Sequence, residues 1–268
     1  MSVEGTKKII GVALAVSLVC SVLVSVSVVS LKPFQERNKK FERIKNILVA
    51  GELLNTKISI EKMYEENITS KVINLETGEI LPAGSYGQEL SPESFDVKKL
   101  SEDLQYSRVI QPERDLAQIR RMPKNMVIYM VVEKGRTKKI ILPIYGKGLW
   151  STMYGFMALD RDLKTIRGFT FYEHGETPGL GGEVDNPAWK AIWQGKRAFD
   201  DEWNLKIEVV KGRVDRTSSE AIYQVDGLSG STITTRGVNN LVRFWLGEDG
   251  YGPFFKKLRK GVSNEQLP

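Results

Sequence analysis

Cysteine and histidine are nearly absent from this chain, which holds one of each among 268 residues. Cys20 lies inside an apolar run, so the rest of the chain can form neither a disulfide nor a thiolate-ligated iron–sulfur cluster. His174 alone excludes a zinc site of cysteine and histidine and leaves little scope for a histidine-based catalytic triad. A redox function would therefore need an organic cofactor.

Nucleotide-binding motifs and concentrated positive charge are also missing. The glycine-rich segment 173–182 (EHGETPGLGG) does not fit G-x-G-x-x-G, and no stretch matches a P-loop, so neither NAD nor ATP binding is predicted. The net charge is +6, but Lys and Arg are spread along the chain, many beside Asp or Glu. This pattern predicts a mildly basic surface near anionic lipid, with no nucleic-acid partner.

A long apolar run is present near the N-terminus. Residues 9–31 carry no charge, and as a helix they would extend about 34 Å, enough to cross a hydrocarbon core of about 30 Å. We expect one retained transmembrane anchor. The alternative is a cleaved signal peptide, whose apolar core is usually about 7–15 residues long and ends at a small-residue site, and the run meets neither condition. Basic residues on its C-terminal side outnumber Lys7 and Lys8, which by charge alone favours a cytoplasmic main domain.

The remaining chain mixes helical and strand patterns without regular alternation. We expect helices at 34–53, 60–68, 187–194 and 236–246, the third with Asn186 as N-cap and Pro187 in the first turn. Strands are expected at 72–75, 80–81, 126–132, 140–145, 153–159, 165–172, 205–210 and 222–225, several as hairpins, while 82–112 lacks a strong element. The fold class predicted is α+β, a mostly antiparallel sheet with flanking helices. The expected parts are 1–33 (anchor), 34–124 (membrane-proximal helices and hairpin) and 125–268 (cofactor-binding domain).

The segment 226–235 (DGLSGSTITT) concentrates five hydroxyl side chains and two glycines immediately before an amphipathic stretch. Glycines allow close backbone approach, hydroxyls donate to phosphate oxygens, and a helix N-terminus presents unpaired N–H groups. The segment therefore predicts an anion cradle, with Ser229, Gly230, Ser231, Thr232 and Thr234 as candidate contacts. The alternative is ordinary helix capping, with Thr234 or Thr235 as the N-cap.

Two further segments are candidates for contact with a flat ring. The loop 173–182 combines a proline with several glycines, and its alternative interpretation is a surface turn. The segment 145–154 (YGKGLWSTMY) places aromatics between glycines, with Trp150 as a candidate wall. Its alternative interpretation is a set of core aromatics beside turn glycines.

The sequence DGLSGST at 226–232 resembles the flavinylation motif D-x-x-(S/T)-(S/G)-A-T, whose last threonine carries FMN through a phosphoester. Ser231 stands where that motif usually has alanine. The whole chain resembles the C subunit of the bacterial sodium-translocating NADH:quinone reductase (Nqr). The resemblance rests on the N-terminal span, on RIKNILVAG at 43–51, PIYGKGLWSTMYGF at 143–156 and HGETPGLG at 174–181, and on the SGST loop. The last two are shared with the G subunit of the related Rnf ferredoxin:NAD complex.

That resemblance implies a function and a set of site residues. Thr232 would carry covalent FMN, installed from FAD by a separate magnesium-dependent flavin transferase. The pocket would be lined by Glu176, Thr177, Gly179, Leu180 and Gly181. The chain would be a single-pass electron-relay subunit of the bacterial inner membrane, with its main domain periplasmic despite the charge bias. Its partners would be the A, B, D, E and F subunits of the complex, with NADH, ubiquinone and sodium sites mainly on those subunits.

Two other interpretations stay open from the sequence. One is an Rnf-type electron-transport subunit, which the long region before residue 125 disfavours. The other is a membrane-anchored assembly module without a redox role, in which the 226–235 segment caps a helix.

Overall fold

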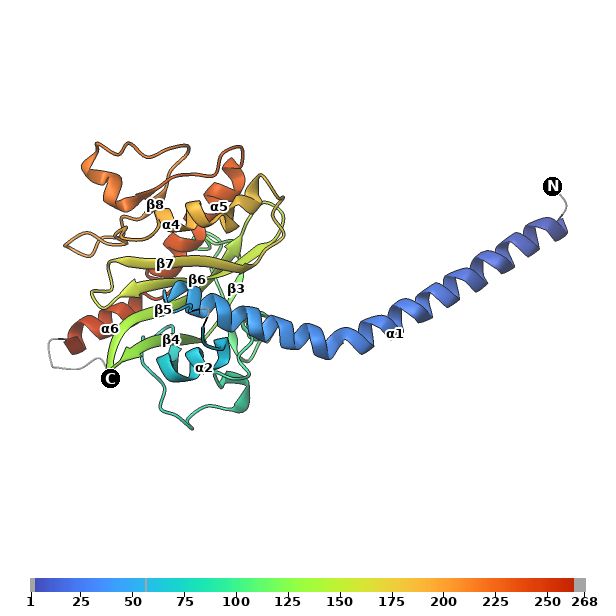
Figure 1. The fold of residues 1–268 in the computed structure, drawn as a ribbon, viewed down its shortest axis with the longest axis horizontal. Helices are drawn as coiled ribbons and strands as arrows, with labels where there is room; N and C mark the ends of the chain where they lie inside the picture. Colours follow the sequence, from blue (N-terminus) through green and yellow to red (C-terminus); the bar gives the residue numbers. More distant parts are fainter. Residues whose placement is uncertain (1–2, 56, 263–268) are drawn as a thin grey trace. The chain divides into compact units, whose positions relative to one another are not determined.

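The computed structural model describes residues 3–55 and 57–262, which divide into a unit up to Arg43 and a unit from Ile44 onward (Figure 1). Helix α1 (Val3–Ala50) supplies the described part of the first unit and continues into the second. Among the described residues, it is the one helix long and apolar enough to cross a membrane, and its apolar side chains between residues 9 and 31 are exposed. The helix expected at 34–53 is therefore the continuation of the apolar helix, and it ends at Ala50.

The main sheet has five antiparallel strands in the order β1-β4-β5-β6-β7. Their bounds are β1 (Ile68–Asn74), β4 (Asn125–Glu133), β5 (Arg136–Lys147), β6 (Thr152–Asp160) and β7 (Ile166–Glu173). The two hairpins predicted after residue 125 are confirmed. The return expected around residues 77–78 is present but short. Ile73 and Ile80 form one bridge on one edge of β1, and the other edge pairs along its whole length with β4.

Strand β5 lies at the centre of this sheet and is covered on both faces. Every residue from 140 to 146 is buried, whereas a strand with one solvated face alternates buried and exposed positions. The Ile141 side chain lies beside Gly51, just after α1. On the opposite parity of the strand, Gly146 faces Leu241 of α5 (Thr232–Leu246), and Trp245 Nε1 donates to the Tyr145 carbonyl at 2.6 Å. The sheet is thus packed between the end of α1 and α5.

Short elements complete the unit that begins at Ile44. They are α2 (Ile60–Asn67), η1 (Gln88–Leu90), α3 (Val97–Glu102), β2 (Ser107–Val109), β3 (Arg121–Pro123), η2 (Gly181–Asp185), α4 (Pro187–Ile192), β8 (Glu208–Val209), η3 (Ser219–Tyr223), β9 (Gln224–Val225) and α6 (Gly252–Val262). The α+β class is confirmed, since helices flank a mainly antiparallel sheet. Strand β1, from the region expected to be membrane-proximal, belongs to the same sheet as the strands after residue 125.

Several local predictions are confirmed and others are wrong. Asn186 caps α4 by accepting the Ala188 N–H at 2.9 Å, as the sequence predicts. The region 82–112, expected to lack a strong element, holds only short ones, of which the six-residue α3 is capped by Asp96 through the amides of residues 98 and 99. The strands expected at 205–210 and 222–225 shrink to the two-residue β8 and β9, which pair in parallel.

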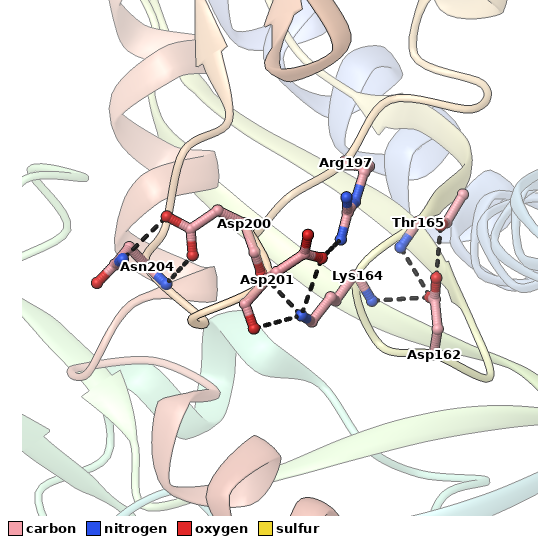
Figure 2. A network of polar contacts seen from close by, with 7 residues as sticks. All are labelled: Asp162, Lys164, Thr165, Arg197, Asp200, Asp201 and Asn204. Atoms are coloured by element: carbon pink, nitrogen blue, oxygen red, sulfur yellow. Dashed lines mark hydrogen bonds and ion pairs between the residues drawn. The ribbon is translucent and has the colours of Figure 1, made fainter. Parts of the chain in front are cut away.

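Side-chain contacts hold the irregular segment between α4 and β8 against the turn that joins β6 to β7 (Figure 2). Lys164 Nζ donates to the carbonyl oxygens of Asp200 and Asp201 at 2.8 and 3.0 Å. Arg197 Nη2 donates to the Asp201 carboxylate at 2.6 Å, and within the turn Asp162 Oδ1 accepts the Lys164 N–H at 2.9 Å. The Asp200 carboxylate accepts from the Asn204 side chain at 2.9 Å, so each of these acidic side chains has a donor. These contacts fix a segment that has few ladder hydrogen bonds.

The contact between β7 and the end of α1 generates a stability prediction. A Cβ added at Gly168 would lie 2.1 Å from the Ala50 carbonyl oxygen, and backbone atoms cannot turn away as a side chain can. We expect Gly168→Ala to lower the free energy of unfolding by about 2–3 kcal/mol, seen as a melting temperature roughly 5 °C or more lower in detergent. Gly87→Ala is the control, since its nearest neighbour is the flexible end of Glu89. Equal melting temperatures for the two variants would contradict the packing argument.

Candidate functional site

Helix α5 begins inside the hydroxyl-rich segment 226–235, not after it. Its first residue is Thr232, so the predicted start at 236 is wrong, and neither Thr234 nor Thr235 is the N-cap. Ser231 occupies the N-cap position with φ −133° and ψ 57°, and its side chain makes no capping hydrogen bond. The first amides of a 15-residue helix are thus left without a side-chain cap, which favours an anion at this end.

The residues before α5 are fixed by local contacts. Asp226 Oδ1 accepts the Val214 N–H at 2.8 Å, and its Oδ2 accepts from Arg216 at 2.7 Å. A Cβ at Gly227 would lie 2.3 Å from the Val210 carbonyl oxygen, and Gly230 has φ +71°, where other residues are strained. These contacts hold the loop in one conformation. The two glycines allow the close approach and the left-handed backbone, and Asp226 ties the loop to the preceding segment by hydrogen bonds.

Thr234 and Thr235 face inward in the first turn of α5. The Thr235 hydroxyl accepts the Leu228 N–H at 3.0 Å, which ties the loop back to the helix. The Thr234 hydroxyl donates to Glu176 at 2.6 Å, and both threonines are buried. Thr232, by contrast, is exposed at the surface. Its hydroxyl is therefore the one in this turn that a large partner can reach.

A cavity of about 370 Å³ lies against this turn, within the range of small-molecule pockets. Three segments far apart in the sequence line it: the connection from β5 to β6, the loop after β7, and the start of α5. The lining residues are Leu149, Trp150, Glu176, Thr177, Leu180, Gly181, Gly230, Ser231, Thr232, Ile233 and Thr234. The exposed apolar side chains include Trp150, 67% exposed, so the cavity pairs an apolar rim with a polar helix end.

Glu176 is the charged side chain of this cavity, and it is 5% exposed. Its Oε1 accepts the amides of Trp150 and Ser151 at 3.0 and 3.3 Å, while Oε2 accepts the Leu149 amide at 3.1 Å and the Thr234 hydroxyl at 2.6 Å. Burial on its own raises the pKa of Glu176, but these hydrogen bonds together lower the pKa by more than burial raises it. The net shift of the pKa is therefore downward. The carboxylate is therefore ionised at neutral pH.

His174 supports the same loop. Its Nδ1 accepts the Glu176 N–H at 3.2 Å, which leaves the hydrogen on Nε2 to donate to Asp185 at 2.8 Å. Asp185 also pairs with Lys190 at 3.7 Å. The single histidine is thus satisfied within the loop, as expected for a structural residue.

The structure brings together most of the residues expected at the site. Those that line the cavity are Trp150, Glu176, Thr177, Leu180, Gly181, Gly230, Ser231, Thr232 and Thr234. Ser229 is exposed beside the lining, and Gly179 forms the turn of the same loop with φ +75°. Leu149 and Ile233 line the cavity without having been predicted, although each adjoins a predicted residue and is exposed despite being apolar.

Comparisons with known proteins agree with this geometry. A family model described as an FMN-binding domain matches residues 148–247, a range that includes every lining residue. The chain is similar to the C subunit of the Na(+)-translocating NADH-quinone reductase of Pseudomonas aeruginosa, at 42% identity over 261 residues, covering 96% of this chain and 98% of the relative. The corresponding protein of Yersinia pestis is 43% identical over 255 residues, covering 94% and 92%.

Two solved structures of the same kind of subunit also match the chain. The crystal structure of Shewanella oneidensis NqrC matches with a TM-score of 0.74 and 32% identity, covering 84% of this chain and 99% of that chain. The C subunit of the Na(+)-translocating NADH-quinone reductase of Parabacteroides distasonis matches with a TM-score of 0.61 and 27% identity, covering 84% and 96%.

The lowered pKa of Glu176 predicts how the site responds to acid. The folded pKa lies below the ordinary value of 4.5, so the stability that the carboxylate contributes is complete above that value and is lost as pH falls through the folded pKa. Unfolding free energies of wild type and Glu176→Gln, measured in urea from about pH 7 to 3, should differ by a constant amount above pH 4.5 and converge below it. A difference that widens toward acid would contradict the assignment.

Proposed function

The chain belongs to the family of the C subunit of the Na+-translocating NADH-quinone reductase, and on that premise we propose that Thr232 carries FMN as a phosphoester to its hydroxyl. The protein is an FMN-carrying electron-relay subunit of that complex. The observation that carries the proposal is the position of Thr232, exposed as the first residue of a helix without a side-chain cap and lining the cavity.

The cavity fits the two ends of FMN. The phosphate would lie at the start of α5, where amide groups and the positive end of the helix dipole stabilise an anion. The ring would be held by the apolar rim of Leu149, Trp150, Leu180 and Ile233, while Thr177 and Gly181 complete the lining. Bound there, FMN supplies reversible electron uptake that this chain's own side chains lack. A covalent link keeps the cofactor from dissociating between turnovers.

The remaining assignments extend from the family. We propose that a separate magnesium-dependent transferase installs FMN from FAD, and that the A, B, D, E and F subunits surround this chain. NADH, ubiquinone and sodium would then bind mainly on those subunits. We also propose that residues 125–268 hold the flavin, that 34–124 connect them to the membrane, and that 1–33 form the anchor, since the FMN-binding match at 148–247 falls within the first of these ranges.

Intact mass tests the attachment site. Protein purified from a host that has the flavin transferase should exceed the calculated mass by FMN less one water, and Thr232→Ala should abolish the increment because the acceptor hydroxyl is gone. Ser229→Ala and Ser231→Ala remove neighbouring hydroxyls and should both keep it. A modified Thr232→Ala protein, or an unmodified wild type, would overturn the proposal and make a non-redox module the interpretation to test.

Orientation needs a separate experiment. α1 is the membrane anchor, and we propose that it crosses the bacterial inner membrane once with the main domain on the periplasmic side. The single native cysteine, Cys20, lies within the apolar run. A cysteine that replaces the exposed Thr217 would therefore be the labelling site in the main domain. We expect Thr217→Cys to react with a membrane-impermeant maleimide in intact spheroplasts, while the native sequence does not. Labelling that requires lysis would place the domain in the cytoplasm.

A further inference from the structure

The Glu176 carboxylate is buried without a cation. Among the residues that the structure describes, no Lys or Arg forms an ion pair with it, and its charge is met by three backbone amides and one hydroxyl. A buried charge is costly unless it is fully hydrogen-bonded, so these four contacts are what allows an ionised side chain at this place. They come from two segments that are about eighty residues apart in the sequence, which makes Glu176 a link between them.

The first segment is the connection from β5 to β6. The amides of Leu149, Trp150 and Ser151 are consecutive, and all three point at the one carboxylate. A Cβ on Gly148 would lie 2.5 Å from Glu176 Oε1, so the backbone touches the carboxylate directly. Such a run of amides around an anion fixes the backbone of the connection. The direction in which Leu149 and Trp150 leave the backbone is therefore set by Glu176.

The second segment is the first turn of α5. Thr234 donates its hydroxyl to Glu176 Oε2, two residues after the proposed attachment site. Gly181 lies against the same pair, because a Cβ there would be 2.5 Å from Thr234 Oγ1 and 2.9 Å from Glu176 Oε2. The amide of Glu176 is itself held by His174, so the carboxylate starts from a fixed backbone. Glu176 thus fixes the rim of the cavity relative to the helix end.

We propose that Glu176 is a positioning residue for the flavin, acting through the residues it holds. We call Glu176, its three amide partners and the Thr234 hydroxyl the Glu176 clamp. The clamp sets the distance and angle between the Trp150 rim and the α5 N-terminus, and so decides how a ring tethered at Thr232 lies in the cavity. This inference rests on the proposed attachment at Thr232, but the clamp itself exists in the protein before flavin is added.

Glu176→Gln tests the clamp with little change in size. A glutamine has one oxygen and one NH2 group, and although the Thr234 hydroxyl can turn to accept, the NH2 group would face either the Leu149 amide or the amides of Trp150 and Ser151, which can only donate. Hydrogen exchange of the full-length protein in detergent should show the amides of residues 149–151 exchanging about tenfold faster or more, with β6 unchanged. Glu173→Gln is the matched control, since Glu173 lies on the same stretch but pairs with Lys98 outside the cavity. If the amides of residues 149–151 exchange in Glu176→Gln at the rate they have in the wild type, the proposal that Glu176 holds them is overturned.

The flavin readout separates this inference from the attachment proposal. With FMN shown on Thr232 by mass, the visible circular dichroism and fluorescence anisotropy of the flavin should both fall in Glu176→Gln and stay unchanged in Glu173→Gln. Unaltered flavin signals in Glu176→Gln would overturn the positioning role even though attachment stands. An unmodified wild type would overturn the attachment, and the exchange experiment, which needs no flavin, would still decide whether the clamp exists.

Thr234→Val covers the case in which Glu176→Gln does not fold. This variant keeps the carboxylate and its three amides but removes the link to α5, so amide protection at 149–151 should persist while the flavin dichroism falls. Thr217→Val is its control, because Thr217 is an exposed threonine whose contacts lie within its own turn. A Thr234→Val protein with wild-type flavin dichroism would overturn the claim that the clamp orients the ring.

Discussion

The pairing of β5 with β4 on one side and β6 on the other is the constraint on which the site depends. Because residues 140–146 are buried on both faces and the exposed Lys147 follows them directly, a shift of β5 in register would carry a charged side chain toward the core. Its last residue, Lys147, lies beside the first turns of α5, since a Cβ on Gly237 would touch the Lys147 carbonyl at 2.5 Å. The strand therefore delivers the 148–151 connection to the helix end, and the cavity forms where the two meet.

A buried carboxylate beside a proposed phosphate would be expected to oppose anion binding, and the hydrogen bonds explain why both fit. Glu176 uses the amides of residues 149–151 and one hydroxyl of α5, none of which belongs to the helix's own free amide groups. The N-terminal amides of α5 stay available for a second anion. Two sets of donors thus serve two negative charges, one built into the protein and one brought by the cofactor.

The local parts of the fold could be predicted from the sequence, and the non-local parts could not. The hairpins after residue 125 follow from alternating apolar runs around short polar turns, which neighbouring residues decide. The pairing of β1 with β4 joins residues about fifty to sixty positions apart, and no local pattern specifies it. Helix α6 was missed although Tyr251, Phe254 and Phe255 are buried at helical spacing, because the segment opens with glycine and proline.

The start of α5 was misplaced for a related reason. Serine and threonine are weak helix formers because their hydroxyls compete for nearby backbone groups, so local propensity favours a cap at Thr234 or Thr235. In the folded chain those hydroxyls are engaged with Glu176 and with the amide of Leu228, and the helix extends back to Thr232. The site residues in the loops were predictable as segments, but their convergence depends on the sheet.

The segment 226–235 shows how much of a functional motif can be structural. Asp226 holds the neighbouring loop, and Gly227 and Gly230 supply space and a left-handed turn. Thr234 and Thr235 face inward and bind protein groups. Because these positions are occupied with holding the loop, Thr232 is the threonine of the segment whose side chain is free to face the cavity from the surface. The motif therefore specifies the presentation of one hydroxyl at the end of a helix, and the chemistry of that hydroxyl depends on the other residues keeping it there.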